Sequence, residues 1–415
     1  MSSYKRAVVD TPAKSDDTPK INKYYESVAI AFRYAKFIVL FFTIIFLMLI
    51  LSFFREEVSV ENFQYLLKYM SSDDSTFITT QKIHYPTSDS KALDIFAGDF
   101  VSAGTNGVTL YDTNGNTVLD IDTVISQPVF AIGKKYGLCY DLSGYSYIVF
   151  NTFAKLSQEE FEFPISDAAI DDRGNYAILT KNKEYRTIIN VYDSDFELTS
   201  RIYKNKYTFD FDINSDRLVY VTADALDSRF LTEVNVIKHK SDSENNIISL
   251  YNEFPIGVRF LGDNIILVTD KSLRFFSFKG GEFSQGKHYS FVYLSPGGFV
   301  NSDEHIILYF EKNTIGSEND IKIYAKDGEL VLTTTLSGKI NSVDLRDNFA
   351  VVQTAECIYR IDIEKKRIDT VKIDSGAEKV IIQADYTVLA CYKNYAKLID
   401  FKNIDDTIYI KAGEG

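Results

Sequence analysis

The sequence contains no tryptophan, and only three of its 415 residues are cysteine and four are histidine. Three thiols are too few for the disulfide framework of a small secreted domain. Cys357 and Cys391 lie in neighbouring repeats and could pair, but burial of Cys139, Cys357 and Cys391 as small apolar side chains is the simpler expectation. No histidine lies at metal-ligand spacing from another ligand, so the sequence predicts no metal site.

Catalytic signatures are also missing. The sequence has no Gly-x-Ser-x-Gly elbow, no phosphate-binding loop and no Cys-x-x-Cys pair. Asp112–Asn116 begins like a calcium loop but has Thr117 and Thr123 where such a loop needs Gly and Glu, so a strand-linking turn is predicted. We therefore predict no catalytic, cofactor-binding or metal-ligating residues and no enzyme activity.

Acidic residues are abundant, and some of them form close pairs. With 58 Asp and Glu in the chain, such pairs arise by chance, and alternating Asp on a strand usually marks its solvated face. A hydrolase dyad is the alternative interpretation. The pairs are Asp171-Asp172, Asp120/Asp122 and Asp210/Asp212.

The net charge of −13 is unevenly distributed. Residues 1–36 contain seven Lys or Arg and four Asp or Glu, about +3, which leaves −16 for the remainder. An acidic remainder repels phosphodiester backbones, so nucleic acid is not an expected partner. Solubility is the simplest explanation of the acidity.

One long apolar segment, Phe37–Phe54, has 18 residues without a charge and is long enough to cross the bilayer as a helix. Basic residues precede it, whereas Glu56, Glu57 and Glu61 follow it, which predicts a cytoplasmic N-terminus and an exported C-terminal part. The preceding segment is too long for a cleavable signal peptide. We expect an uncleaved anchor, with the lipid bilayer as a partner.

The segments flanking this span differ in pattern. Residues 1–36 form a basic cytoplasmic tail without apolar periodicity, for which disorder is predicted. Residues 55–75 contain Phe63, Leu66, Leu67 and Met70 at helical spacing, which predicts a short amphipathic stalk.

From residue 76 to residue 410 the chain shows an all-β pattern rich in Phe, Tyr and β-branched residues. A repeat unit, or phrase, of strand, turn, strand and polar turn occurs eight times. Equivalent positions in successive units are 36, 40, 42, 47, 41, 43 and 37 residues apart. This period is typical of propeller blades, so we predict an eight-bladed β-propeller, with seven blades or a β-sandwich as alternatives. Equivalent positions in the first strand of each phrase are Phe100, Tyr136, Tyr176, Leu218, Ile265, Ile306, Phe349 and Tyr386.

The ends of the repeat region suggest how the ring closes. The last phrase ends after a third strand near Phe401, and Thr76–Tyr85 is an alternating strand ahead of the first full unit. Because an open ring would expose unpaired backbone groups, we predict that Thr76–Tyr85 supplies the outer strand of the final blade.

Phrases such as LYDTNGNTVLDI and IYAKDGELVLTTTL resemble quinoprotein-like propeller blades, except that the closing Trp is never present. Leu, Ile or Tyr must then make the contacts between blades. No residues match a quinone or metal site. The layout of basic tail, single span, stalk phrase Val58–Met70 and Trp-poor repeats also resembles a family of membrane-anchored proteins of Gram-positive anaerobes, domain of unknown function 5711. This resemblance implies no activity.

Two classes of function remain. The first is a non-enzymatic propeller at the outer face of the cell membrane of a Gram-positive bacterium, binding or scaffolding an envelope protein or polymer. The alternative is an extracytoplasmic hydrolase or lyase that acts on envelope glycans through carboxylates around the central channel. The aromatic stretch His288–Tyr293 is expected to be core packing, with a binding rim as the other possibility.

Overall fold

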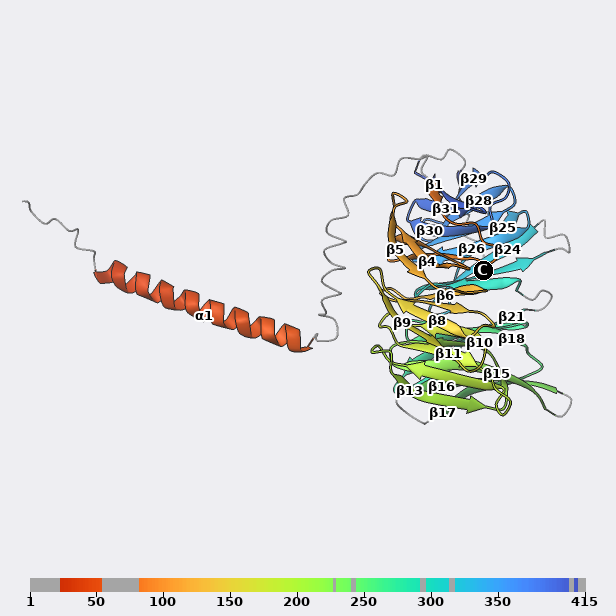
Figure 1. Ribbon diagram of the computed structural model, residues 1–415, viewed down its shortest axis with the longest axis horizontal. Helices are drawn as coiled ribbons and strands as arrows, with labels where there is room; N and C mark the ends of the chain where they lie inside the picture. Colours follow the sequence, from red (N-terminus) through yellow and green to blue (C-terminus); the bar gives the residue numbers. More distant parts are fainter. Residues whose placement is uncertain are drawn as a thin grey trace, which may run out of the picture. The chain divides into compact units, whose positions relative to one another are not determined.

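The computed structural model describes residues 23–53, 82–226, 229–239, 244–291, 296–312, 318–402 and 407–409. The chain divides into two compact units, Met1–Thr76 and Phe77–Gly415. The described part of the first unit is one helix, and the described part of the second consists of strands and their connections (Figure 1).

The helix α1 spans Lys23–Phe53, and no Gly or Pro interrupts it. Its segment Val28–Phe46 is long and apolar enough to cross a membrane, which makes it a candidate membrane anchor or signal sequence. The helix begins at Lys23, inside the predicted tail of residues 1–36, and continues through the predicted span to Phe53. The predicted stalk, residues 55–75, lies outside the described residues.

The strands of the second unit form eight antiparallel sheets, each with at least four strands, which confirms the prediction of an eight-bladed propeller. The first four blades follow the chain in order. Blade 1 is β2 (Ala92–Phe96), β3 (Asp99–Gly104), β4 (Gly107–Tyr111) and β5 (Thr117–Asp122); blade 2 is β6 (Pro128–Ile132), β7 (Gly137–Asp141), β8 (Ser146–Phe150) and β9 (Lys155–Glu160); blade 3 is β10 (Ile165–Ile170), β11 (Tyr176–Thr180), β12 (Thr187–Tyr192) and β13 (Leu198–Lys204); blade 4 is β14 (Tyr207–Ile213), β15 (Arg217–Leu226), β16 (Arg229–Lys238) and β17 (Glu244–Tyr251).

The second half of the ring continues in the same way until the chain ends are reached. Blade 5 is β18 (Pro255–Leu261), β19 (Asn264–Thr269), β20 (Ser272–Lys279) and β21 (Glu282–Ser290); blade 6 is β22 (Gly298–Asn301), β23 (His305–Glu311), β24 (Glu318–Ala325) and β25 (Leu330–Ser337); blade 7 is β26 (Ile340–Arg346), β27 (Phe349–Thr354), β28 (Cys357–Asp362), β29 (Arg367–Lys372) and β33 (Thr407–Tyr409); blade 8 is β30 (Lys379–Ala384), β31 (Thr387–Cys391), β32 (Tyr395–Asp400) and β1 (Lys82–His84).

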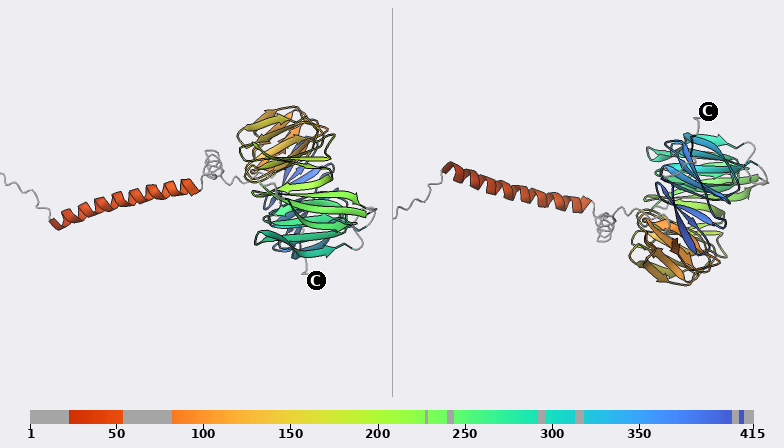
Figure 2. Two further views of the ribbon diagram at one scale, coloured as in Figure 1. Left: turned by 90° about the horizontal axis from the view of Figure 1, so that it is seen from below. Right: turned by 90° about the horizontal axis from the view of Figure 1, so that it is seen from above.

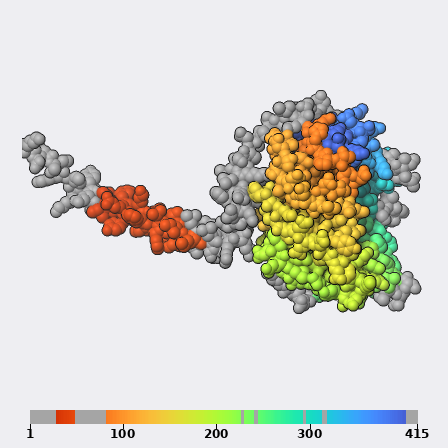
Figure 3. All heavy atoms as spheres, in the orientation of Figure 1, coloured from red at the N-terminus to blue at the C-terminus, as the bar shows by residue number. Residues whose placement is uncertain are grey.

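The first strands of the blades form a closed inner ring. Each contacts the first strand of the next blade, and β30 of blade 8 contacts β2 of blade 1. In Figures 1 and 2 the orange first blade therefore lies beside the blue last blade, and their atoms adjoin on the surface in Figure 3. We call the face at which the first strands begin the inlet face; the connections between blades lie there.

The positions that mark the repeat in the sequence belong to the second strands, not the first. Phe100 lies in β3 and Tyr176 in β11, one strand outward from the inner ring. The second strands are almost continuously buried, whereas the first strands carry charged residues at the axis. The more regular apolar pattern therefore predicts the second strand of each blade.

Strands from the two ends of the propeller sequence together form blade 8, as predicted. Strand β1 lies within Thr76–Tyr85 and pairs antiparallel with β32 through Ile83↔Ala396. Residues 76–81 lie outside the described residues. The last strand, β33, was not expected: it pairs with β29 and covers the outer edge of blade 7.

Eight hydrophobic clusters fill the spaces between blades, one at each junction. Aromatic rings take the place of the missing tryptophan. At the junction of blades 2 and 3, Tyr147 lies 5.8 Å from Tyr176, which stacks on Tyr192 at 4.5 Å. This agrees with the expectation that Tyr and aliphatic side chains make the contacts between blades.

Candidate functional site: the central channel and its mouth

Carboxylates on the first strands join neighbouring blades across the inner ring. On β14 of blade 4, Asp210 Oδ2 accepts the amide of Val258 at 2.8 Å, and Asp212 Oδ2 accepts that of Phe260 at 2.8 Å, both in blade 5. Asp344 of blade 7 likewise accepts the amide of Ile382 in blade 8 at 2.6 Å. The first strands of neighbouring blades are not hydrogen-bonded to each other through their backbones. These carboxylates therefore accept hydrogen bonds from backbone amides of the next blade.

Arg259 on β18 lies among the carboxylates of Asp167, Asp210 and Asp212. Its guanidinium donates to Asp210 Oδ2 and to the carbonyl of Val258, and its charge acts on Asp212 and Asp167. Asp167 accepts a hydrogen bond from the Tyr140 hydroxyl at 2.9 Å. The cluster therefore combines three carboxylates and one guanidinium from blades 3, 4 and 5.

Burial favours the protonated form of two acids of this cluster, Asp212 and Asp167. Burial raises the pKa of Asp212 to about 6, although Arg259 and two backbone amides oppose the shift. Burial and the neighbouring Asp210 raise the pKa of Asp167. In blade 7, burial also raises the pKa of Asp344. Carboxyls with raised pKa values are found at functional sites, but also in structural networks.

The other acidic pairs are not brought together with this cluster. Asp171 accepts the amides of Arg173 and Asn175 at 2.8 Å and closes a tight turn. Asp120 accepts a hydrogen bond from Thr109 on the neighbouring strand at 2.9 Å, and Asp122 is exposed. Among the sequence pairs, only Asp210/Asp212 belongs to this cluster, whereas Asp172 lies at one end of the channel.

The turn at Asp112 is a strand connection, as the sequence predicts. Asp112 Oδ1 accepts the amides of Asn114 and Asn116, both at 2.8 Å. Within the part of the chain that the structure describes, no group of three His, Cys, Asp or Glu is arranged to hold a metal ion.

A hollow lies at the inlet end of the channel, between blades 6, 7 and 8. Its volume is about 410 Å³, and it opens where the first strands of these blades begin. Its wall combines the aromatic side chains of Phe299 and Tyr309 with polar groups of Asn341, Ser342 and Lys379. Concave sites with mixed apolar and convergent polar walls are typical of binding sites.

At the opposite end, charged groups from facing blades cross the channel. Lys134 of blade 2 lies 2.6 Å from Asp172 of blade 3 and 2.9 Å from Asp303 of blade 6. Hydrogen bonds to both carboxylates raise the pKa of Lys134. Blades 2 and 6 are half a turn apart, so this ion-pair bridge narrows the channel at that end.

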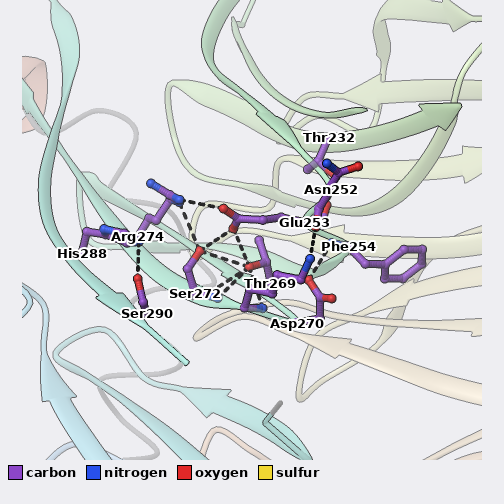
Figure 4. Close-up of polar contacts among 11 residues, drawn as sticks. Thr232, Asn252, Glu253, Phe254, Thr269, Asp270, Ser272, Arg274, His288 and Ser290 are labelled. Carbon is purple, nitrogen blue, oxygen red and sulfur yellow. Dashed lines mark hydrogen bonds and ion pairs between the residues drawn. The ribbon is translucent and has the colours of Figure 1, made fainter. Parts of the chain in front are cut away.

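A buried polar network holds the connection into blade 5 (Figure 4). Glu253 accepts hydrogen bonds from Thr269 at 2.9 Å, Ser272 at 2.6 Å and Arg274 at 2.9 Å. Burial opposes ionisation of Glu253, but these bonds and the charge of Arg274 outweigh it and lower its pKa. The network joins one connection to two strands, so its role is structural.

The aromatic stretch next to this network packs against the neighbouring blade. Tyr289 lies 4.7 Å from Tyr324, and its hydroxyl donates to the carbonyl of Gly328 at 2.7 Å. Phe291 lies 5.1 Å from Phe310. Packing is therefore the correct interpretation for these rings; residues 292 and 293 of the stretch lie outside the described residues.

The cysteines form no disulfide, which settles the question of pairing. Cys139 and Cys391 are buried, and Cys357 is half-buried. Burial raises the pKa of Cys391 to about 12, so this thiol is unreactive at neutral pH.

The chain belongs to the protein family described as a family of unknown function (DUF5711), whose pattern matches residues 71–401. No curated protein matches its sequence. The family resemblance seen in the sequence is therefore confirmed.

Solved structures resemble this chain at low sequence identity. Apo AztD from Citrobacter koseri is 11% identical with a TM-score of 0.54, covering 80% of this chain and 96% of its own. BamB from Moraxella catarrhalis is 11% identical with a TM-score of 0.43, covering 79% and 99%. At such identities the comparison with AztD shows a common propeller fold.

Sequence reasoning missed Arg259 and Lys134. Both lie at the axis or its end, where residues from distant blades meet, and no spacing in the sequence marks that position. The adjacent pair Asp210/Asp212 was the one available signal.

Proposed function

We propose that this protein is a single-pass membrane protein whose propeller lies outside the cytoplasm and binds an envelope protein or polymer without chemical turnover. Helix α1 is the anchor, and the mouth of the central channel is the binding site. The basic residues before the apolar segment and the acidic ones after it support this orientation.

The hollow of about 410 Å³ at the channel mouth is the observation that carries the binding role. It is framed by first strands that the inner ring holds rigidly, so a partner meets a preformed surface. The charges of Lys379 and Glu378 line it beside the ring of Phe299, which suits a partner with both polar and apolar groups.

The channel carboxylates support a role without turnover. Asp210 and Asp212 each accept a backbone amide of the next blade, and Arg259 donates to Asp210. A general base needs a free lone pair that faces a substrate. Here the Oδ2 atom of each of the two residues joins the blades.

Site-specific photo-crosslinking in native membranes tests the binding site. A photoreactive amino acid in place of exposed Asn341, at the mouth, is expected to give a discrete adduct. The same group in place of exposed Asp263, in a turn on the opposite face, is the matched control. Equal adducts from both positions, or none from Asn341, would count against the mouth as the site.

Anchoring has its own test. The full-length protein is expected to stay in the membrane pellet after alkaline extraction, and added protease is expected to digest the propeller of intact protoplasts but spare an N-terminal epitope. Release by alkali, or protection of the propeller, would contradict the proposed topology.

A carboxylate-dependent hydrolase or lyase is the second candidate, favoured by one observation: burial raises the pKa of Asp212 to about 6 beside Asp167 and Asp210. The full-length protein in detergent would be assayed on envelope glycans. Turnover that Asp212→Asn abolishes, while the melting temperature is kept, would replace the binding role by this one.

A further inference from the structure

Exposed aromatic side chains of the propeller gather at one edge of the inlet face. Of seven exposed Tyr and Phe in the described part of the propeller, five lie at this edge, and Tyr145 and Phe153 lie elsewhere. Their exposed fractions lie between 44% and 52%. We call this set the aromatic edge: Tyr203, Tyr207, Phe209, Tyr251 and Phe254.

The aromatic edge is made up of residues from blades 3 and 4 and from the connection into blade 5. Phe254 lies 5.0 Å from Phe209 and stacks on Phe230 at 5.2 Å. Tyr203 contacts the ring of Tyr185 at 4.8 Å. Because large apolar surface in water is unfavourable, rings that pack together and stay half exposed mark a contact surface.

Positive side chains are interspersed with these rings. The Arg186 guanidinium lies 4.9 Å from the centre of the Tyr207 ring, and that of Arg229 lies 5.3 Å from the centre of Tyr251. Residues 181–186 and 203–207 together contain five Lys or Arg and one Glu, about +4, in a chain of net charge −13. Acids of blade 4 pair with three of these cations, among them Arg186, whose guanidinium lies 4.0 Å from Asp224.

Some of these cations remain available for a partner. Lys204 is paired with Glu244, and Lys206 with Glu233. Lys181 and Lys183 are exposed at the tip between β11 and β12. A surface of Tyr, Phe, Lys and Arg suits the headgroup region of a bilayer, where aromatic rings take the interfacial position and cations meet anionic lipids.

We propose that the aromatic edge docks on the anionic surface of a lipid bilayer. The proposal rests on the membrane anchoring proposed above. Between Phe53 at the end of α1 and Lys82 at the start of β1 the chain has 28 residues. Whatever their conformation, they reach at most roughly 100 Å. The tether keeps the propeller at a high effective concentration near the bilayer, so a weak contact suffices.

The absence of tryptophan gives the test a clean reporter. Phe254→Trp places a single indole at the aromatic edge, and Phe153→Trp places one on the opposite face at a similar exposure, 41% against 44%. Each full-length variant is reconstituted into nanodiscs with phosphatidylglycerol and brominated lipid. We expect bromine to quench the fluorescence of the F254W variant and to leave that of F153W unchanged.

The charge contribution is tested in the same discs. Lys181→Glu with Lys183→Glu, added to F254W, is expected to reduce the quenching, and so is replacing phosphatidylglycerol by phosphatidylcholine. Melting curves of all variants establish that the propeller is folded.

Other outcomes overturn the proposal. Equal quenching of both reporters, or none of F254W, rejects docking through this edge. Fluorescence of F254W that changes with the number of chains per disc, without bromine quenching, assigns the edge to a second copy instead. If alkali extracts the chain, anchoring fails; if the chain stays in the disc and F254W is not quenched, docking alone fails.

Discussion

The junction of blades 4 and 5 and the junction of blades 8 and 1 lie on opposite sides of the ring and are held in different ways. Blades 4 and 5 are consecutive in the chain, and the ties from Asp210 and Asp212 join residues 48 positions apart. Blades 8 and 1 are not consecutive. Their contacts join chain ends, such as Lys91 Nζ to the carbonyl of Lys393 at 2.8 Å, 302 positions apart.

The difference indicates at which junction the loss of a contact is expected to open the ring. At the junction of blades 4 and 5, the chain itself keeps the blades close, so the buried charges set their alignment. At the seam, contacts between distant parts of the chain oppose opening, among them β1, the Tyr85 hydroxyl on the Tyr392 carbonyl and the pair Lys91–Glu378 at 2.8 Å. A contact between distant residues must offset a large closure entropy, so losing it affects the whole ring.

The largest effect is expected from breaking the seam. Ile83 is 4% exposed and packs in the cluster between blades 8 and 1. Ile83→Asp places an unpaired charge there, which should lower the free energy of unfolding by about 4 kcal/mol. Thermal and denaturant unfolding of the full-length protein in detergent measures it.

A neighbouring position provides the control for this prediction. His84 lies in the same strand but points to solvent, so His84→Asp should change stability by about 0.5 kcal/mol or less. Similar losses for both variants would mean that the strand tolerates no charge at all. No loss for Ile83→Asp would show that β1 does not hold the ring closed.

A smaller, pH-dependent effect is expected at the other junction. An unfolded Asp titrates near pH 4, whereas burial raises the pKa of folded Asp212 to about 6. The folded state therefore binds the extra proton, and this contribution to stability is full below about pH 4 and lost as the pH rises through about 6. Its size is at most about 3 kcal/mol.

Asp212→Asn removes this titration while keeping an acceptor for the Phe260 amide. The melting temperature of the variant should depend less on pH between about 4 and 7 than that of the parent protein. Asp263→Asn, at an exposed turn of blade 5, is the control and should leave the pH profile unchanged. Parallel profiles for all three proteins would show that Asp212 has an ordinary pKa.

The smallest effect is expected at the ion-pair bridge across the channel end. Lys134, Asp172 and Asp303 are all largely exposed, and exposed pairs contribute about 1 kcal/mol or less. Lys134→Met should therefore change the melting temperature little, and high salt should reduce even that difference. A loss as large as that of Ile83→Asp would mean that this bridge, like the seam, holds the ring closed.

Much of the fold could be predicted from local pattern, and little of the site. The second strands, with Phe100 and Tyr176 as markers, are buried on both faces, so their apolar period survives in the sequence. The first strands carry polar residues such as Asp212 and Arg259 at the axis, where neighbours come from other blades. No local rule links Asp210 to Val258, because their contact depends on how blades are arranged.

By itself, the sequence determined the all-β class, the count of eight repeats, the apolar helix and the closure by an N-terminal strand, because each follows from periodicity or from the need to pair backbone groups. Tertiary structure alone decided which acids meet at the axis, that Lys134 bridges blades 2, 3 and 6, and that β33 covers blade 7. It also decided that the exposed aromatic residues share one edge with basic loops. The physical reason is that these contacts depend on the relative placement of blades, which ring closure fixes and which no segment of the chain encodes locally.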